Sequence, residues 1–431
     1  MKRPPTFPVP IPSSVYYGWI IVGVALAMNL AAAATNPVIF SFFIGPMSED
    51  LGWSRSTLSW AVTFRIAAGG VLAPLLGAMV DRFGVRWLGT LAGLLAGGCL
   101  IGFAFVHQAW QLYLLAGLSG ASGFGGPVIP NVAVAKWFEL KRGRALAIAT
   151  VGMPGGTIMG IFLAQWLIDY VGWRQAGITF GVLLCALAAP LCAWFMRRTP
   201  EEMGLNPDGA KETHNPAITL HGASQLGTSV DWTTRQALRS STLWLIVLAM
   251  ALSGVALTGT LVHRVAFWRE SGMSPSLVAF GTAMDPFTMI FSVLAFGILG
   301  EQVRTRYLGL MGGAGLALSM LPMVFAMGNA YSILANNITW GIMAGTYITC
   351  MNLIWPNYFG RKSLGSISGI TLPISVGASG LGPPLFGYLL DVGVTYTVLW
   401  TVSLVMLLAV GALLFLAKPP SLKQSKISTA G

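Results

Sequence analysis

The sequence predicts an all-α membrane protein, with twelve transmembrane helices arranged in two six-helix lobes. Three observations lead to this fold class. The 431 residues are 55% hydrophobic and 9% charged, whereas roughly 25% of the residues of a soluble domain are charged. Apolar runs of about 20 residues, the length that crosses a bilayer, follow one another along the chain. Short motifs recur at an offset of about 220 residues, which indicates an internal duplication.

The apolar runs give the expected helices in order. In the first half they lie at 17–42, 56–79, 88–106, 110–135, 144–168 and 175–196, and in the second at 241–264, 275–299, 306–326, 330–354, 364–388 and 396–416. We therefore expect an N-terminal lobe over 1–196, a cytoplasmic central loop over 197–240, a C-terminal lobe over 241–416 and a cytoplasmic tail over 417–431. The first run is too long for the core of a cleavable signal peptide, so we expect it to stay in the protein.

The basic residues predict the orientation. An even number of crossings places both termini on one side of the membrane. If that side is the cytoplasm, 20 of the 25 Lys and Arg residues lie inside. The five exceptions are Arg55, Arg65, Arg174, Arg264 and Arg269. The positive charge is spread over short loops and forms no single basic face, so we expect the lipid bilayer and a small-molecule substrate as partners, and no nucleic acid. We expect a monomer in a bacterial cytoplasmic membrane.

The duplication has three parts that follow one another in the same order. The segment 77–86, at the end of the second expected helix, returns in weaker form as 297–306. Asp169 and Asp391 close the fifth helix of each half. The other matching pairs are Trp137-Phe138 with Tyr358-Phe359, and Met153-Pro154 with Leu372-Pro373. Such repeats are typical of transporters with two lobes.

These motifs also resemble a known family. The segment 77–86 resembles the cytoplasmic signature between helices 2 and 3 of the major facilitator superfamily. The segments 137–152 and 198–209 are similar to bacterial relatives of monocarboxylate and oxalate:formate transporters. The resemblance covers nearly the whole chain. It implies a secondary transporter that moves a small organic anion, a monocarboxylate first of all, by alternating access, with a proton as the candidate coupling ion.

The sequence departs from that family at its anion site. Monocarboxylate transporters carry an arginine one turn beyond an aspartate in helix 8, and Met289 stands there in this chain. Their helix 1 lysine would fall near Asn36 or Pro37. Efflux of an amphipathic or cationic compound by proton antiport stays open as an alternative, favoured by the aromatic-rich helices and by Asp285 as a lone acid. The sequence has no phosphate-binding loop, metal-ligand cluster or nucleophile with a base, so we expect neither an enzyme nor a cofactor or metal.

Two charges lie deep in expected helices and are the first candidates for a substrate site. Arg65 falls near the middle of helix 2, and Asp285 falls near the middle of helix 8, directly before Pro286. A charge at this depth must face protein or water. Helices 2 and 8 approach each other in the superfamily that the chain resembles, so we expect these two residues to pair. A guanidinium suits a carboxylate substrate. Arg65 could instead be a structural arginine bonded to a backbone carbonyl. Asp285 could be either a titrating acid or a fixed counter-ion.

The remaining candidates are polar residues near helix ends and within apolar runs. We expect His263 to contact the solute and Arg264 to gate the outer end of helix 7, unless the two only reach toward interfacial water. The uncharged pocket candidates, which could equally join helices to one another, are Asn29, Asn36, Asn131, Tyr347 and Asn352. The cytoplasmic gating candidates, which could equally serve topology alone, are Asp81, Arg82, Arg86, Glu301 and Arg306.

Overall fold

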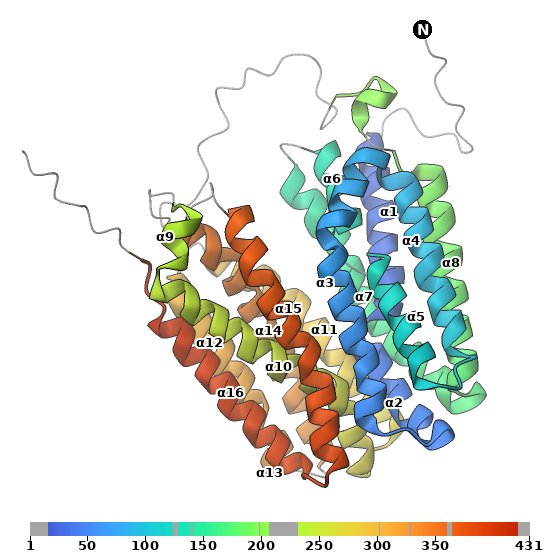
Figure 1. The fold of residues 1–431 in the computed structure, drawn as a ribbon, viewed down its shortest axis with the longest axis vertical. Helices are drawn as coiled ribbons and strands as arrows, with labels where there is room; N and C mark the ends of the chain where they lie inside the picture. The colour runs from blue at the N-terminus through green and yellow to red at the C-terminus, as the bar shows by residue number, and fades with distance from the viewer. Residues whose placement is uncertain are drawn as a thin grey trace, which may run out of the picture.

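The computed structural model describes residues 16–123, 128–138, 141–197, 199–206, 232–300, 302–326, 329–359 and 364–420. The regular elements in these ranges are all helices. Nine helical spans in the described ranges, two of which join consecutive helices, are long and apolar enough to cross a membrane. Figure 1 shows that they form two bundles, one from the first half of the chain and one from the second.

The N-terminal lobe makes six crossings. Its helices are α1 (Tyr17–Ala32), α2 (Pro37–Leu51), α3 (Arg55–Phe83), α4 (Val85–Phe103), α5 (Ala109–Ala121), α6 (Val128–Trp137), α7 (Arg142–Val171) and α8 (Trp173–Phe195). A short 3₁₀ turn (Ala33–Thr35) joins α1 to α2, so that these two helices form the first crossing. Helices α5 and α6 together form the fourth.

The C-terminal lobe makes the other six crossings. Its helices are α10 (Ser241–Glu270), α11 (Pro275–Leu299), α12 (Thr305–Ser319), α13 (Leu321–Phe325), α14 (Ala330–Phe359), α15 (Leu364–Asp391) and α16 (Tyr396–Leu416), with α12 and α13 forming one crossing. The segment between the lobes contributes a 3₁₀ turn (Pro200–Met203) and α9 (Thr234–Leu238). The predicted all-α fold of two six-helix lobes is confirmed.

Two helices run further than expected. The first was expected to end near residue 42, yet the chain stays helical to Leu51 after a break at Asn36. Pro37 lacks an N–H, and the Asn36 side chain accepts a hydrogen bond from the Val38 N–H at 3.0 Å, so this break restarts the helix. Helix α10 likewise continues to Glu270 instead of ending at Arg264. Arg264 therefore lies inside a helix.

The lobes meet along α3 and α15, which run antiparallel. The Thr63 hydroxyl donates to the Gly380 carbonyl at 2.5 Å. A Cβ atom on Gly387 would lie 2.7 Å from the Cα atom of Ser56, so glycine allows the two backbones to approach at this point. From residue 71 of α3 and residue 372 of α15 onward, away from these contacts, the two helices diverge (Figure 1). Val71 is 76% exposed there, and Leu372 is 51% exposed.

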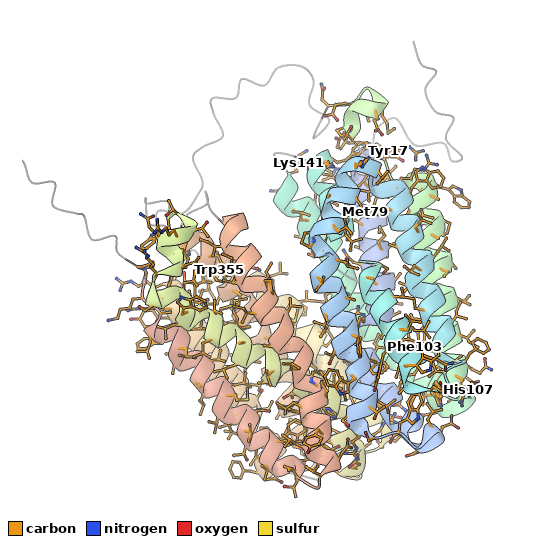
Figure 2. All side chains as sticks on the ribbon, in the orientation of Figure 1. Tyr17, Met79, Phe103, His107, Lys141 and Trp355 are labelled. Atoms are coloured by element: carbon orange, nitrogen blue, oxygen red, sulfur yellow. The ribbon has the colours of Figure 1, made fainter. Side chains whose placement is uncertain are left out.

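The two ends of the molecule therefore differ. The lobes touch at the end where α3 begins and α15 ends, which we call the closed end. They diverge toward the opposite end, which carries α9 and which we call the loop end (Figure 1). In Figure 2 the labelled residues Tyr17, Lys141 and Trp355 lie toward the loop end, and His107 lies toward the closed end. A site between the lobes would thus be reached from the loop end in this conformation.

Candidate functional site

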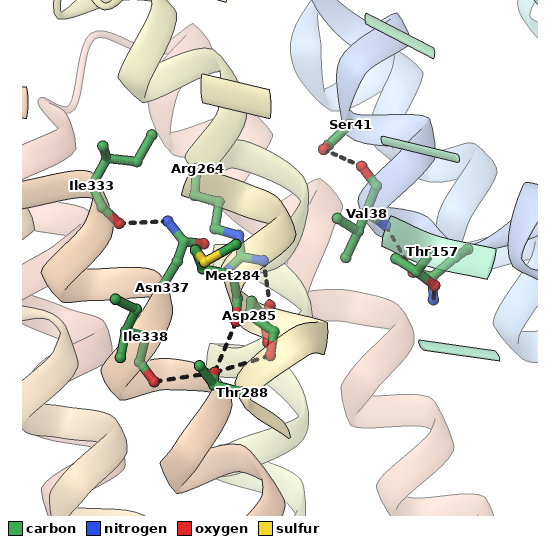
Figure 3. Close-up of polar contacts among 11 residues, drawn as sticks. Val38, Ser41, Thr157, Arg264, Met284, Asp285, Thr288, Ile333, Asn337 and Ile338 are labelled. Atoms are coloured by element: carbon green, nitrogen blue, oxygen red, sulfur yellow. Dashed lines mark hydrogen bonds and ion pairs between the residues drawn. The ribbon is translucent and has the colours of Figure 1, made fainter. Parts of the chain in front are cut away.

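A buried ion pair lies in the C-terminal lobe. Arg264 on α10 and Asp285 on α11 are joined by a contact of 2.5 Å between Nη2 and Oδ2 (Figure 3). The Arg264 side chain is 0% exposed and the Asp285 side chain is 8% exposed. Each charge would be costly at this depth without the other. The pair thus places a neutralised cation and carboxylate together inside the membrane-spanning region.

The guanidinium of Arg264 has donors that its own protein does not use. Its Nε and Nη1 atoms are buried and have no hydrogen-bond partner. Its Cζ atom lies 5.6 Å from the ring centroid of Trp340 on α14, a distance at which the ring attracts a cation. A buried donor without a partner costs about 1–3 kcal/mol. The arrangement is therefore suited to a guest that brings acceptor oxygens.

Further polar atoms near the pair also lack partners. Thr260 lies one helical turn before Arg264, Thr282 one turn before Asp285, and Asn337 one turn before Trp340, so each shares a face with its neighbour. All three residues are fully buried. The Oγ1 atoms of Thr260 and Thr282 and the Oδ1 atom of Asn337 have no hydrogen-bond partner. The Asn337 amide donates to the Ile333 carbonyl at 2.8 Å, as Figure 3 shows. Native proteins rarely leave such atoms unpaired, so a polar ligand or a water molecule would satisfy them.

The structure corrects two expectations about these charges. The predicted pair of Arg65 with Asp285 is wrong, because Asp285 pairs with Arg264, while Arg65 donates to the Thr35 hydroxyl at 2.6 Å inside the N-terminal lobe. The alternative that Arg264 reaches toward interfacial water is also wrong, since its side chain is fully buried. The two errors have different causes: Arg65 turns toward Thr35 within its own lobe, and α10 extends past Arg264 so that Arg264 reaches Asp285.

His263 lies where the lobes meet. Its Nε2 atom is 2.9 Å from the Pro383 carbonyl oxygen on α15 and 3.3 Å from the Ser59 hydroxyl on α3. The imidazole is fully buried. Its immediate neighbour Arg264 forms the ion pair, so one turn of α10 carries both the pair and a contact across the lobe interface. Movement between the lobes would therefore act directly on this turn.

The uncharged candidates mostly join helices within one lobe. The Asn29 amide donates to the Ala149 carbonyl at 2.8 Å, and the hydroxyl groups of Tyr347 and Ser253 lie 2.6 Å apart. Asn36 caps α2, as described above, and its amide lies 3.5 Å from the Thr157 hydroxyl. Asn352 is exposed, and the side chain of Asn131 lies outside the described residues. In the described part of the chain, no hydrogen bond links these candidates to Arg264 or Asp285.

A charged contact between the lobes lies at the closed end, and we name it the closed-end latch: Arg55, Glu270, Asp391 and Tyr396. The Arg55 guanidinium contacts Glu270 Oε1 at 2.5 Å and donates to the Tyr396 hydroxyl at 2.6 Å. The Asp391 carboxylate accepts hydrogen bonds from the N–H groups of Arg55, at 3.2 Å, and Ser56, at 3.0 Å. A carboxylate from one lobe thus caps the start of α3 in the other.

A second contact crosses between the lobes at the same end. Arg269 on α10 donates to the Gln165 side chain on α7 at 2.6 Å, and Gln165 donates to Asp169 at 2.5 Å. The Arg269 guanidinium also lies 5.8 Å from the ring of Phe42 on α2. The sequence reasoning missed both contacts, although a signal existed: Asp169 and Asp391 are the repeated acids that close the fifth helices. Arg55 and Arg269, however, entered the sequence analysis only as evidence for the orientation.

At the loop end the predicted gating residues stay within their own lobes. The Arg82 guanidinium lies 5.3 Å from the Phe83 ring, Arg86 donates through Nε to the Ala193 carbonyl at 2.6 Å, and Arg306 lies 3.1 Å from the Tyr307 hydroxyl. The side chain of Asp81, and Glu301 as a whole, lie outside the described residues. A charged latch at this end remains a prediction.

That prediction can be tested at Asp81. The Asp81→Asn variant removes the charge and keeps the shape, so transport should slow while insertion and abundance stay as in the parent chain. The measurement is the initial uptake rate, normalised to the protein recovered in the membrane. An unchanged rate would show that these loop charges serve topology alone.

Two six-helix lobes that close against each other at one end, with a buried ion pair inside the C-terminal lobe, define a membrane transporter with many crossings. The chain belongs to the Major Facilitator Superfamily, whose family model matches residues 20–372. Monocarboxylate transporter 3 of Rattus norvegicus is 24% identical over 391 residues, which cover 89% of this chain and 76% of that protein. Monocarboxylate transporter 11 of Homo sapiens is also 24% identical, with 94% and 84% covered.

Solved structures share the fold. A bacterial homolog of the human lysosomal transporter Spinster, determined in an inward-facing and occupied conformation, has a TM-score of 0.70 at 15% identity and covers 94% of this chain and 97% of its own. The nucleoside transporter NupG has a TM-score of 0.69 at 13% identity, with 93% and 99% covered. The family match and the similarity to the two monocarboxylate transporters confirm the expected resemblance, and the solved structures show the fold.

Proposed function

We propose that the protein is a secondary transporter of a small organic anion, with a monocarboxylate as the first candidate. The observation that carries this proposal is Arg264, a fully buried guanidinium with two unpartnered nitrogens. A carboxylate offers two oxygens to two such donors in a fixed geometry. The similarity to proteins named monocarboxylate transporters supports the same substrate class.

In the proposed cycle the two lobes rock about the ion pair. Arg264 is buried in this conformation, so a solute reaches it when the lobes move. Opening toward the closed end requires the closed-end latch to separate, because its bonds join α3 to α10, α15 and α16. Closing the loop end is the role we assign to Asp81, Arg82, Arg86, Glu301 and Arg306. The basic loops favour an inward-facing loop end, in a bacterial cytoplasmic membrane.

Proton coupling is part of the proposal, with Asp285 as the acid. Asp285 and a bound solute compete for the same guanidinium. Protonation of Asp285 removes its charge and leaves Arg264 to the solute, whereas loss of the proton restores the pair and releases the solute. Proton and anion would then travel together. This mechanism gives a reason why the ion pair is buried while two nitrogens of Arg264 have no hydrogen-bond partner.

Efflux of an amphipathic cation is the second candidate, and the structure weakens its support. It was favoured by reading Asp285 as a lone acid that could attract a cation. Asp285 is instead paired with Arg264 at 2.5 Å, and a cationic solute would meet that arginine. We therefore rank anion transport first.

The deciding experiment is uptake into proteoliposomes that contain the full chain. Labelled formate, lactate, pyruvate and oxalate are offered with and without a pH gradient. We expect saturable uptake of at least one of them, enhanced when the outer solution is acidic. Arg174→Met is the control variant and should keep the parental uptake, since Arg174 pairs with Asp50 within one lobe and is 36% exposed. Accumulation of an amphipathic cation with no uptake of any anion would overturn the proposal.

A further inference from the structure

A cavity lies inside the N-terminal lobe, away from the ion pair. It is bounded by the 3₁₀ turn after α1 and by α2, α3, α4, α5 and α8, its volume is about 50 Å³, and it is open on one side. All the residues that line it belong to the N-terminal lobe. Figure 2 labels one of them, Phe103, in the half of this lobe nearer the closed end. Because the cavity is open on one side, a guest larger than its volume would lie partly in the mouth.

One end of the cavity carries a cation without a counter-ion. Arg65 lines it together with Thr35 and Ser119. The Thr35 hydroxyl accepts one hydrogen bond from Arg65 Nη2 and donates its own proton to the Ala32 carbonyl at 2.8 Å. Arg65 Nε is buried and has no partner, and no carboxylate within the described ranges forms an ion pair with Arg65. A guanidinium has five N–H donors, so an anion would satisfy what the lobe leaves open.

The walls of the cavity are aromatic. Phe40 of α2 and Phe103 of α4 stand edge to face, with centroids 6.4 Å apart. Phe43 of α2 and Phe180 of α8 do the same at 6.3 Å. All four rings line the cavity. Aromatic rings prefer such edge-to-face or offset contacts with other rings, so the walls favour an aromatic guest over an aliphatic one.

We propose that this cavity is a binding site for an aromatic carboxylate, separate from the transport site, with Arg65 holding the carboxylate and the phenylalanines holding the ring. The site belongs to one lobe, so its occupancy does not require the lobes to rock. Thr63, two residues before Arg65 on α3, bonds across the lobe interface to Gly380. A bound ligand that fixes α3 therefore acts on the same helix that joins the lobes.

The test measures the binding of phenylacetate to the full purified chain by calorimetry. We expect phenylacetate to bind, and acetate and 2-phenylethanol, which lack the ring or the charge, to bind at least about tenfold more weakly. Arg65→Gln should weaken phenylacetate binding by about tenfold or more. Ala116→Leu, which fills the cavity from α5 and leaves Arg65 in place, should do the same.

A transport-site variant separates the two sites. The Arg264→Met/Asp285→Leu double variant, altered only in the C-terminal lobe, should bind phenylacetate as the parent chain does. The inference is overturned if Ala116→Leu binds with parental affinity, a result that stands even if Arg65→Gln fails to fold. It is also overturned if binding is lost only in the double variant, because phenylacetate would then occupy the transport site. Neither result would contradict uptake of small anions.

Discussion

Arg264→Met should lower the stability of the protein by about 3–5 kcal/mol and abolish anion uptake, and adding Asp285→Leu should restore most of the stability but none of the uptake. The single change leaves the Asp285 carboxylate buried without its partner, which is the costly state. The double change removes both charges and replaces them with apolar side chains, which is often neutral. Stability is measured as the unfolding midpoint in detergent, and uptake is measured in proteoliposomes.

The two measurements distinguish a structural pair from a functional one. If the pair only holds α10 to α11, the double variant should transport normally once its stability returns. If Arg264 binds the solute, uptake stays at least about 30-fold below the parent, since truncating a buried charged contact costs about 2–5 kcal/mol. The exposed pair of Arg174 with Asp50 is the control: Arg174→Met should change stability by less than about 1 kcal/mol. A double variant with parental uptake would contradict our assignment of the transport site.

The helices were largely predictable because the bilayer dictates their length. Helix α11 (Pro275–Leu299) begins and ends where the apolar run does. The Ser274 side chain caps it by accepting from the Leu277 N–H, and Pro275 occupies a first-turn position. Helix α16 (Tyr396–Leu416) also matches its predicted limits. Such ends are local features, so a single sequence contains them.

The partners of the buried charges were not predictable in the same way. Apolar runs give the depth of a residue, but not the direction in which a helix turns it. Arg65 and Asp285 were paired on depth and on family resemblance, whereas the rotation of α3 turns Arg65 toward Thr35. Arg264 was placed at a helix end because charge interrupts the apolar run there. The helix continues because Asp285 neutralises that charge.

The contacts between lobes depend on the conformation as well as on the sequence. Asp391 was recognised as the repeat of Asp169, but its role requires the start of α3 to lie beside the end of α15. That proximity belongs to the state in which the closed end is shut. A transporter must break such contacts in each cycle, so their strength is limited. The Glu270 side chain is 48% exposed, and an exposed ion pair such as that of Glu270 with Arg55 is weak enough to break.

Asp391→Ala should therefore open the closed end more often without unfolding the protein. It removes the two hydrogen bonds that cap α3 across the interface, at a cost of about 0.5–2 kcal/mol to the closed state. The open population then rises by about 2- to 30-fold. The reporter is Ser59→Cys, since Ser59 is fully buried at the interface beside His263. An impermeant maleimide, applied from the closed-end side, should label it faster by the same factor.

The control for this experiment lies at the same end of the molecule. Arg174→Ala breaks the pair with Asp50 inside the N-terminal lobe, so it perturbs charge nearby without touching the interface. Labelling of Ser59→Cys should then stay at its parental rate, after subtraction of the signal from the four native cysteines. If Asp391→Ala and Arg174→Ala accelerate labelling equally, the effect is general loosening of that end. If neither does, Asp391 does not hold the lobes together, and the other contacts across the interface, such as those of Thr63 with Gly380 and of Arg269 with Gln165, must carry the closure.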